Sequence, residues 1–291
     1  MMLSQILLPA ALFCLMLGLG LGLTLSDFRR LLERPKLLLA GLVGQLLLLP
    51  LLVFVLLQLW SLPTELAVGL MIVALAPGGA TSNLISHLCR GDLALSVSLT
   101  GLSSLIVPLS LPVGTAVALE FWQAGALDQP FPVLPTMLKL VLMALLPVLL
   151  GMLLRRRFSA FALAVQPLVK ALALVFMLAV IGLISWSNWD RLESYLSLLA
   201  PLILLIATLA MLLGYQLARL VDADAAAGRT LAIEVGIQNA GTALLVTGAV
   251  LQQPQMSAAV LLYGILMQIP ALLLIIGSNL PGQSRAQTSA R

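Results

Sequence analysis

The stretch Ile233-Glu234-Val235-Gly236-Ile237-Gln238-Asn239-Ala240-Gly241 places a carboxylate, two amides and two glycines inside an apolar segment that covers approximately residues 230–251. An ionisable side chain within a membrane is costly and rare, and it usually serves ion or substrate traffic. The glycines on either side of Gln238-Asn239 predict a helix that breaks near the middle of the bilayer and exposes its backbone carbonyls and amides.

The composition of the whole chain agrees with a membrane location. Of its 291 residues 61% are hydrophobic and 9% are charged, against about 25% charged residues in a soluble domain. Because about 20 residues cross the hydrocarbon core, nine apolar stretches are long enough to span it: 5–25, 37–59, 65–89, 93–119, 133–154, 158–186, 195–217, 230–251 and 258–280. We therefore expect an all-α polytopic membrane protein with one membrane domain over residues 1–291, and we exclude an ordinary globular protein.

A second polar break, Pro77-Gly78-Gly79-Ala80-Thr81-Ser82-Asn83, interrupts the third of these stretches. The first break described lies in the eighth stretch, so the two broken segments cross the membrane in opposite directions. Broken helices at corresponding places of two inverted halves indicate the binding site of a secondary transporter. The symmetry is imperfect, because nine spans divide into four and five and one span is missing from the first half.

The basic residues are concentrated in alternate loops. Twelve of them fall in one set of loops and only Arg191 falls in the opposite set; the twelve are Arg29, Arg30, Arg34, Lys36, Arg90, Arg155, Arg156, Arg157, Arg219, Arg229, Arg285 and Arg291. This is the positive-inside pattern, and it predicts an external N-terminus, a cytoplasmic C-terminus and a disordered cytoplasmic tail over 281–291. The net charge of +4 is thereby explained without a nucleic-acid partner.

Glu234 is the residue around which we expect chemistry, as a cation ligand or as a proton carrier. A sodium ion needs five or six oxygen ligands, and hydroxyl and amide oxygens suit a hard cation. Ser82 and Asn83 supply such oxygens at the first break, and Ser96 and Thr100, four residues apart, share one face of the next span. Each hydroxyl taken alone is also compatible with a hydrogen bond to its own helix.

Two lone amides leave alternatives open. Gln45 in the second span and Gln268 in the ninth could each join helices by hydrogen bonding or bind a ligand. The restarted helices near Ala80-Thr81 and Asn239-Ala240 have free N–H groups and a positive dipole end, which favour an anionic group. We therefore expect an anionic substrate beside the cation site.

The motifs resemble those of the bile acid:sodium symporter family, within the bile acid/arsenite/riboflavin transporter superfamily, over nearly the whole chain. The most specific matches are Ala76-Pro77-Gly78-Gly79-Ala80-Thr81-Ser82-Asn83, the segment from Arg90-Gly91-Asp92 to Thr100, and Glu234-Val235-Gly236-Ile237-Gln238-Asn239. The resemblance implies a panel domain and a core domain that carries two crossed broken helices, here approximately 5–25 with 133–187 and 37–119 with 195–280. The family usually has ten spans, and the first one is missing here.

The resemblance also implies two sodium sites. The first would consist of Ser82, Asn83, Ser96, Thr100 and Glu234, and the second of Gln45, Glu234, Gln238 and the backbone carbonyls of Val235 and Ile237. We expect the substrate to dock near Thr81, Asn239 and Gln268.

The resulting hypothesis is a sodium-coupled symporter of an organic anion, either a small carboxylate or a bile-acid-like molecule, that works by alternating access in the bacterial inner membrane. The alternative is a proton-coupled carrier or arsenite-type exporter of the same superfamily, with Glu234 as proton carrier. An enzyme is not expected, because the single His87 has no evident partner for catalysis. Beyond the substrate and membrane lipid, no obligatory protein partner is inferred.

Overall fold

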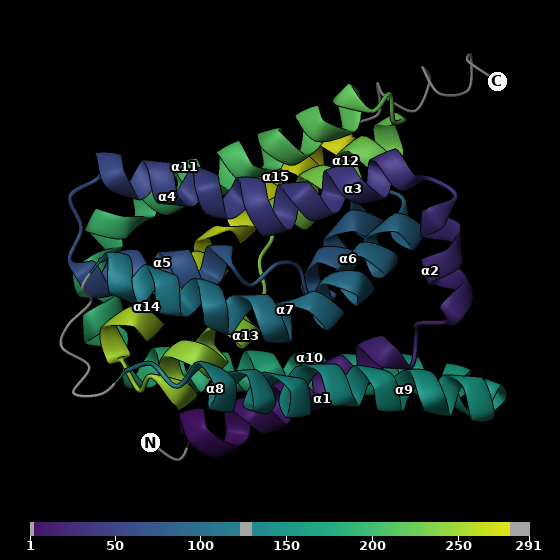
Figure 1. Cartoon of the computed structure of the whole chain (residues 1–291), viewed down its shortest axis with the longest axis horizontal. Coiled ribbons are helices and arrows are strands. Elements are labelled where there is room, and N and C mark those ends of the chain that lie inside the picture. Colours follow the sequence, from purple (N-terminus) through teal and green to yellow (C-terminus); the bar gives the residue numbers. More distant parts are fainter. Residues whose placement is uncertain (1–2, 123–129, 280–291) are drawn as a thin grey trace.

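The computed structural model describes residues 3–122 and 130–279, and within those ranges the chain folds into helices without a β-strand (Figure 1). Six continuous helices are long and apolar enough to cross a membrane: Pro35–Leu59, Leu93–Phe121, Val133–Arg157, Ser159–Ser187, Trp189–Leu220 and Pro254–Asn279. Three shorter apolar helices cover Gln5–Gly20, Thr64–Ala74 and Ala240–Val250. The prediction of an all-α polytopic membrane protein is confirmed, whereas the count of nine spans stays a prediction. The predicted tail 281–291 lies outside the described residues.

The α-helices are α1 (Leu8–Gly20), α2 (Leu25–Leu32), α3 (Pro35–Val43), α4 (Leu49–Leu59), α5 (Thr64–Ala74), α6 (Ala80–Leu88), α7 (Leu93–Phe121), α8 (Val133–Leu140), α9 (Leu146–Arg157), α10 (Ser159–Ser187), α11 (Trp189–Leu220), α12 (Ala225–Gly236), α13 (Ala240–Leu244), α14 (Pro254–Leu266) and α15 (Gln268–Asn279). Four π-helical segments adjoin them: η1 (Leu3–Leu7), η2 (Gly44–Leu48), η3 (Val141–Leu145) and η4 (Leu245–Val250).

Three of the π-helical segments have a common origin in proline. η1, η2 and η3 each begin six residues before a proline, namely Pro9, Pro50 and Pro147. A proline inside a helix lacks its N–H and clashes with the carbonyl four residues earlier, and a wider π turn in front of it accommodates both effects without ending the helix. The helix therefore continues past each proline, and Gln45 is placed inside η2.

Both predicted breaks are present, and they meet. Residues 75–79 separate α5 from α6, and residues 237–239 separate α12 from α13. Pro77 and Gln238 form an isolated antiparallel bridge, and the backbone N–H of Asn239 donates to the carbonyl of Ala76 over 2.8 Å. The two extended segments thus satisfy each other's backbone groups inside the membrane, where an unpaired group is costly.

The helices are arranged in layers (Figure 1). α1 packs against α9 and α10, and together with α8 these helices form the layer at the bottom of the view. α3, α4, α11 and α15 lie at the top, and α5, α6, α7, α13 and α14 lie between. The contact between α1 and α9 is close because Gly20 lacks a Cβ, which would collide with the carbonyl of Val148.

The buried and exposed side chains separate the interior from the lipid-facing surface. The core between the layers holds fully buried side chains such as those of Leu70, Ile203 and Val260. Most of α10 is exposed, including Leu168 and Val175, which fits contact with lipid. The end of the molecule where α6 and α9 finish and α3 and α12 begin is called the basic end below, because its arginines include Arg34, Arg90, Arg157 and Arg229; it is at the right in Figure 1.

Candidate functional site

Glu234 lies in the last turn of α12, directly before the break, and its side chain is fully buried. Two hydroxyls of α7 reach its carboxylate: Ser96 Oγ donates to Oε1 over 2.6 Å, and Thr100 Oγ1 donates to Oε2 over 3.1 Å. Gly78 in the other break is equally close, since a Cβ on that residue would lie 2.9 Å from Oε2. The carboxylate therefore joins both breaks and α7.

The first predicted ligand set is completed by two residues from the start of α6. The Oδ1 atom of Asn83 lies 2.7 Å from Ser96 Oγ and 3.3 Å from Thr100 Oγ1. Ser82 is fully buried, its hydroxyl donates to the carbonyl of Gly79 over 2.8 Å, and a Cβ on Gly78 would lie 3.3 Å from this hydroxyl. The structure thus brings together all five residues of the first set, which we call the Glu234 cage: Ser82, Asn83, Ser96, Thr100 and Glu234.

The Glu234 cage has more oxygen–oxygen contacts at hydrogen-bonding distance than it has hydroxyl protons. Ser96 and Thr100 carry one hydroxyl proton each, but each hydroxyl lies within hydrogen-bonding distance of both the Glu234 carboxylate and the Asn83 amide oxygen. Two protons cannot satisfy four contacts. Among the described residues the ion pair found is that of Arg34 with Asp92, so no basic side chain neutralises Glu234. A buried, unpaired carboxylate is unfavourable, and a small hard cation or a proton would satisfy this set of donors.

The second predicted ligand set is less assembled. Gln45 is fully buried in η2, its Oε1 accepts from Ser103 Oγ over 2.9 Å, and its Nε2 has no hydrogen-bond partner. The Nε2 of Gln238 donates to the carbonyl of Val235 over 2.7 Å, while its Oε1 is buried without a partner. η2 does lie against α12, because a Cβ on Gly44 would come within 3.0 Å of Val235. No hydrogen bond in the described residues joins Gln45 to Gln238.

The residues predicted for the substrate are divided by the structure. Asn239 caps α13 by accepting from the backbone N–H of Thr242 over 3.0 Å, and a Cβ on Gly79 would lie 3.3 Å from its side chain. Thr81 is half-buried in the first turn of α6. The side chain of Gln268 donates to the carbonyl of Gly264 in its own helical stretch over 3.2 Å. No hydrogen bond of the described residues connects Gln268 with Thr81 or Asn239.

Sequence reasoning missed contacts at the crossing. Met267, rather than its neighbour Gln268, touches the break, since its sulfur accepts from the backbone N–H of Gln238 over 3.4 Å. Gly264 lets α14 approach α13, because its Cβ would come within 2.8 Å of Ala240. Ser103 follows Thr100 on the polar face of α7, and this continued helical spacing was a readable signal.

A narrow cavity lies between the bottom layer and the two breaks. Pro77, Gly78 and Asn239 line it from the breaks, and Met16 of α1 and Leu140 of α8 line it from the bottom layer. Its free volume is about 10 Å³, roughly the space of one water molecule. A larger open hollow, of about 630 Å³, is at the basic end, where Arg29, Arg155 and Arg156 are among its lining residues.

Comparison with known proteins gives consistent matches. The profile of the Sodium Bile acid symporter family matches residues 9–195. The chain is 32% identical to an uncharacterized sodium-dependent transporter, YocS, of Bacillus subtilis, over 78% of this chain and 69% of that protein. It is 35% identical to the probable sodium/metabolite cotransporter BASS1, chloroplastic, of Arabidopsis thaliana, over 77% and 54%. It is 30% identical to the corresponding BASS2 protein of Oryza sativa, over 79% and 54%. The chain thus spans about half the length of these plant relatives.

Proposed function

The chain belongs to the sodium bile acid symporter family, and from this premise we propose that it carries an organic anion across the membrane together with sodium, by alternating access. Family and relatives are transporters, so the protein is a multi-pass membrane transporter and not an enzyme, as the sequence predicted. One observation on this chain's own residues supports sodium coupling: the Glu234 cage has too few hydroxyl protons for its oxygen–oxygen contacts.

The first sodium ion binds in the Glu234 cage. It replaces the missing positive charge, and it lets each hydroxyl turn an oxygen lone pair toward the ion. Because the cage draws ligands from α6, α7 and α12, a bound ion fixes the crossing of the two broken helices. Sodium binding therefore orders the part of the protein that faces the substrate.

A second sodium ion uses Gln45, Glu234, Gln238 and the carbonyls of Val235 and Ile237. The buried Oε1 of Gln238 and Nε2 of Gln45 support this proposal because both lack a partner, and an unsatisfied buried polar group costs about 1–3 kcal/mol. A rotation of Gln238 would free the carbonyl of Val235, and a flip of the Gln45 amide would present its oxygen. Two ions per transport cycle are therefore compatible with the residues present.

The substrate is an organic anion, a small carboxylate or a bile-acid-like molecule, that docks near Thr81, Asn239 and Gln268. The free N–H groups at the start of α6 favour a negative charge there. The positive charges of Arg29, Arg155 and Arg156 in the lining of the large hollow at the basic end would also attract an anion. Bound sodium completes the attraction by neutralising Glu234 next to the docking place. Gln268 must release Gly264 to take part.

Alternating access follows from a movement of two layers. We assign residues 5–25 and 133–187 to a panel and residues 37–119 and 195–280 to a core, in agreement with the packing of α1 against α9 and α10. The cavity of about 10 Å³ between them is too small for an organic anion, so the panel and core must separate on one side at a time. In the orientation set by the twelve-to-one division of basic residues, the basic end faces the cytoplasm of a bacterial inner membrane.

The first test is the thermal stability of the detergent-purified protein in sodium, compared with potassium and choline. A ligand that binds only the folded state at 100 times its Kd stabilises that state by about 2.7 kcal/mol, so a sodium-specific rise of Tm is expected. Glu234→Ala should abolish the rise, and Glu120→Ala, which removes an exposed carboxylate at the end of α7, should retain it. A rise that depends on pH but not on sodium, and that is lost in Glu234→Ala, would favour the proton-coupled alternative.

A further inference from the structure

A pair of buried hydroxyls lies between the Glu234 cage and the basic end. Ser86 Oγ and Thr230 Oγ1 are 2.9 Å apart, and both side chains are fully buried. Ser86 follows Ser82 by four residues on α6, and Thr230 precedes Glu234 by four residues on α12. Because a helix rises about 1.5 Å per residue, the pair lies about one helical turn from the cage.

The turn Arg90-Gly91-Asp92 lies directly over these hydroxyls. The backbone N–H of Gly91 donates to the carbonyl of Ser86 over 2.8 Å, and Thr230 Oγ1 donates to the carbonyl of Asp92 over 3.2 Å. A Cβ on Gly91 would lie 2.5 Å from Thr230 Oγ1 and 2.6 Å from Ser86 Oγ. A glycine is therefore required here, and the half-buried Gly91 covers the fully buried hydroxyl pair.

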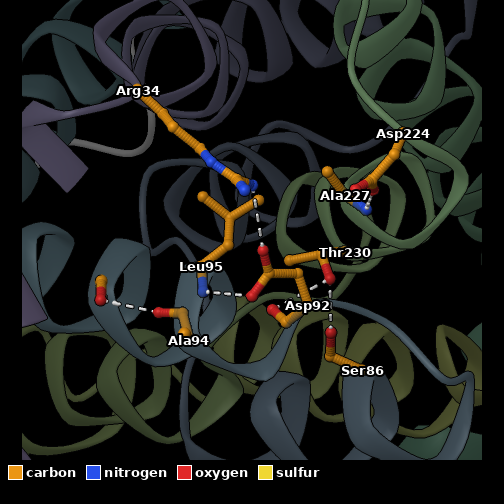
Figure 2. A network of polar contacts seen from close by, with 9 residues as sticks. Arg34, Ser86, Asp92, Ala94, Leu95, Asp224, Ala227 and Thr230 are labelled. Carbon is orange, nitrogen blue, oxygen red and sulfur yellow. Dashed lines mark hydrogen bonds and ion pairs between the residues drawn. The ribbon is translucent and has the colours of Figure 1, made fainter. Parts of the chain in front are cut away.

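The turn is tied down from several elements. Arg34, just before α3, forms an ion pair with the Asp92 carboxylate over 3.5 Å, and the other carboxylate oxygen accepts from the N–H of Leu95 (Figure 2). Arg229 of α12 donates to the carbonyl of Arg90 over 2.8 Å. Arg90 itself has a φ of 54°, a backbone conformation that is unfavourable for a residue with a side chain. These contacts hold a strained turn in place.

An open hollow of about 230 Å³ lies on the outer side of Asp92. Among the side chains that the structure describes, its lining includes three carboxylates, those of Asp27, Glu33 and Asp92, and the guanidinium of Arg34. An excess of negative charge around a hollow raises the local concentration of cations. The hollow thus meets the electrostatic requirement for the mouth of a cation path.

We propose that the Arg90-Gly91-Asp92 turn and Arg34 form a gate, and that the hydroxyls of Ser86 and Thr230 are the step through which sodium moves between the Glu234 cage and this hollow. The inference rests on the proposed sodium site. When the turn lifts, a departing ion exchanges cage oxygens for the two hydroxyls and then for the Asp92 carboxylate. The ion pair that holds the gate is 61% exposed on its Arg34 side, and an ion pair so exposed is weak, so it adds at most about 1 kcal/mol to the free energy of opening.

Thiol accessibility tests the gate without reference to sodium. In a Cys14→Ser, Cys89→Ser background, Ser86→Cys is treated with a membrane-impermeant methanethiosulfonate. Arg34→Gln should raise the modification rate about fivefold, which corresponds to about 1 kcal/mol, the upper end for an exposed ion pair. Lys36→Gln, which replaces an exposed basic residue two positions after Arg34 that makes no ion pair among the described residues, is the control and should not change the rate. Thr230→Cys serves as a second reporter if the first does not fold. Equal rates with both substitutions would overturn the gate.

Sodium exchange across proteoliposomes tests the path. Thr230→Val should slow isotopic sodium exchange about tenfold, which corresponds to about 1.4 kcal/mol of barrier, and leave the sodium concentration for half-maximal Tm rise unchanged. Thr247→Val is the matched control. Thr247 lies in η4, beyond the break that follows α12, it is equally buried, and its hydroxyl is hydrogen-bonded to that of Ser257. Two results would contradict the proposed sodium path through Ser86 and Thr230. One is an unchanged exchange rate in Thr230→Val; the other is a shift of the half-maximal sodium concentration as large as the change in rate. If the wild type has no sodium-specific Tm rise, the proposed function fails, while thiol accessibility still decides the gate.

Discussion

At the scale of single residues, the chemistry depends on a carboxylate surrounded by oxygens that lack enough protons. This part of the site was predictable from sequence. Glu234 is the acidic residue in the interior of a predicted span, whereas Glu65 stands at the end of one, and Ser96 and Thr100 share one helix face by their spacing. What could not be predicted is where an amide points. The contact of Met267 with the break joins residues 29 positions apart. The hydrogen bond of Gln238 to Val235 is local, but it depends on the backbone conformation of the break.

Thr100→Val should weaken sodium binding about tenfold, because it removes one oxygen of the cage and keeps the side chain's shape. A sodium titration of Tm measures this change. Thr115→Val is the control on the same helix. Its hydroxyl is buried without a hydrogen-bond partner, so the substitution should leave the midpoint in place and raise Tm slightly. Equal midpoints for both variants would remove Thr100 from the ligand set.

Gln45→Leu should reduce stability in sodium but not in choline. In choline the variant should be no less stable than the wild type, since an unsatisfied buried amide, which costs about 1–3 kcal/mol, is removed along with the bond to Ser103. In sodium, the dependence of Tm on sodium concentration should become less steep, as expected when one ion binds instead of two. Gln58→Leu, on an exposed side of α4, is the comparison. An unchanged steepness would show that Gln45 is not a ligand.

At the scale of elements, both breaks were predictable because each combines glycine with polar residues inside an apolar run. The π-helical segments were not predicted, although the prolines that follow three of them are visible in the sequence. Close helix contacts were partly readable. The glycines of α1 are visible in the sequence, but the partner that each one approaches became known only from the fold.

Gly214→Ala should destabilise the protein by about 1–3 kcal/mol, the usual cost of overpacking. A Cβ at this position of α11 would collide with the carbonyl of Leu231 in α12. Gly182→Ala in α10 has nothing within 4 Å of the new methyl group, so it should stabilise by up to about 1 kcal/mol through helix propensity. Thermal unfolding in detergent compares the two variants. An unchanged Tm for Gly214→Ala would mean that α11 and α12 can separate to accommodate the methyl group.

At the scale of the whole molecule, the charge pattern predicts orientation, and the structure brings Arg34, Arg90, Arg157 and Arg229 to one end of the molecule. The grouping of α1 with α9 and α10 was predicted through family resemblance alone. Apolar segments carry little information about which of them are neighbours, because lipid and protein interiors are similarly apolar.

A fluorescent protein that folds only in the cytoplasm, fused after Arg291, should fluoresce, and a periplasmic phosphatase fused at the same place should be inactive. The reason is the excess of basic residues in the loops of the basic end. The same pair of reporters placed after residue 188, in the opposite set of loops, provides the internal control. The reverse pattern at both places would invert the proposed orientation and the side on which the gate opens.

The exposed helix α10 has a consequence for the choice of membrane. Its 29 residues extend over about 43 Å at about 1.5 Å per residue, whereas the hydrocarbon layer of a typical bilayer is about 30 Å thick. The helix must tilt or locally stretch the bilayer to hide its apolar side chains. A panel that changes tilt during transport would change this mismatch, so acyl-chain length becomes a means of adjusting turnover: rates in lipids of short and long chains should differ even when headgroup, sodium and substrate are held constant.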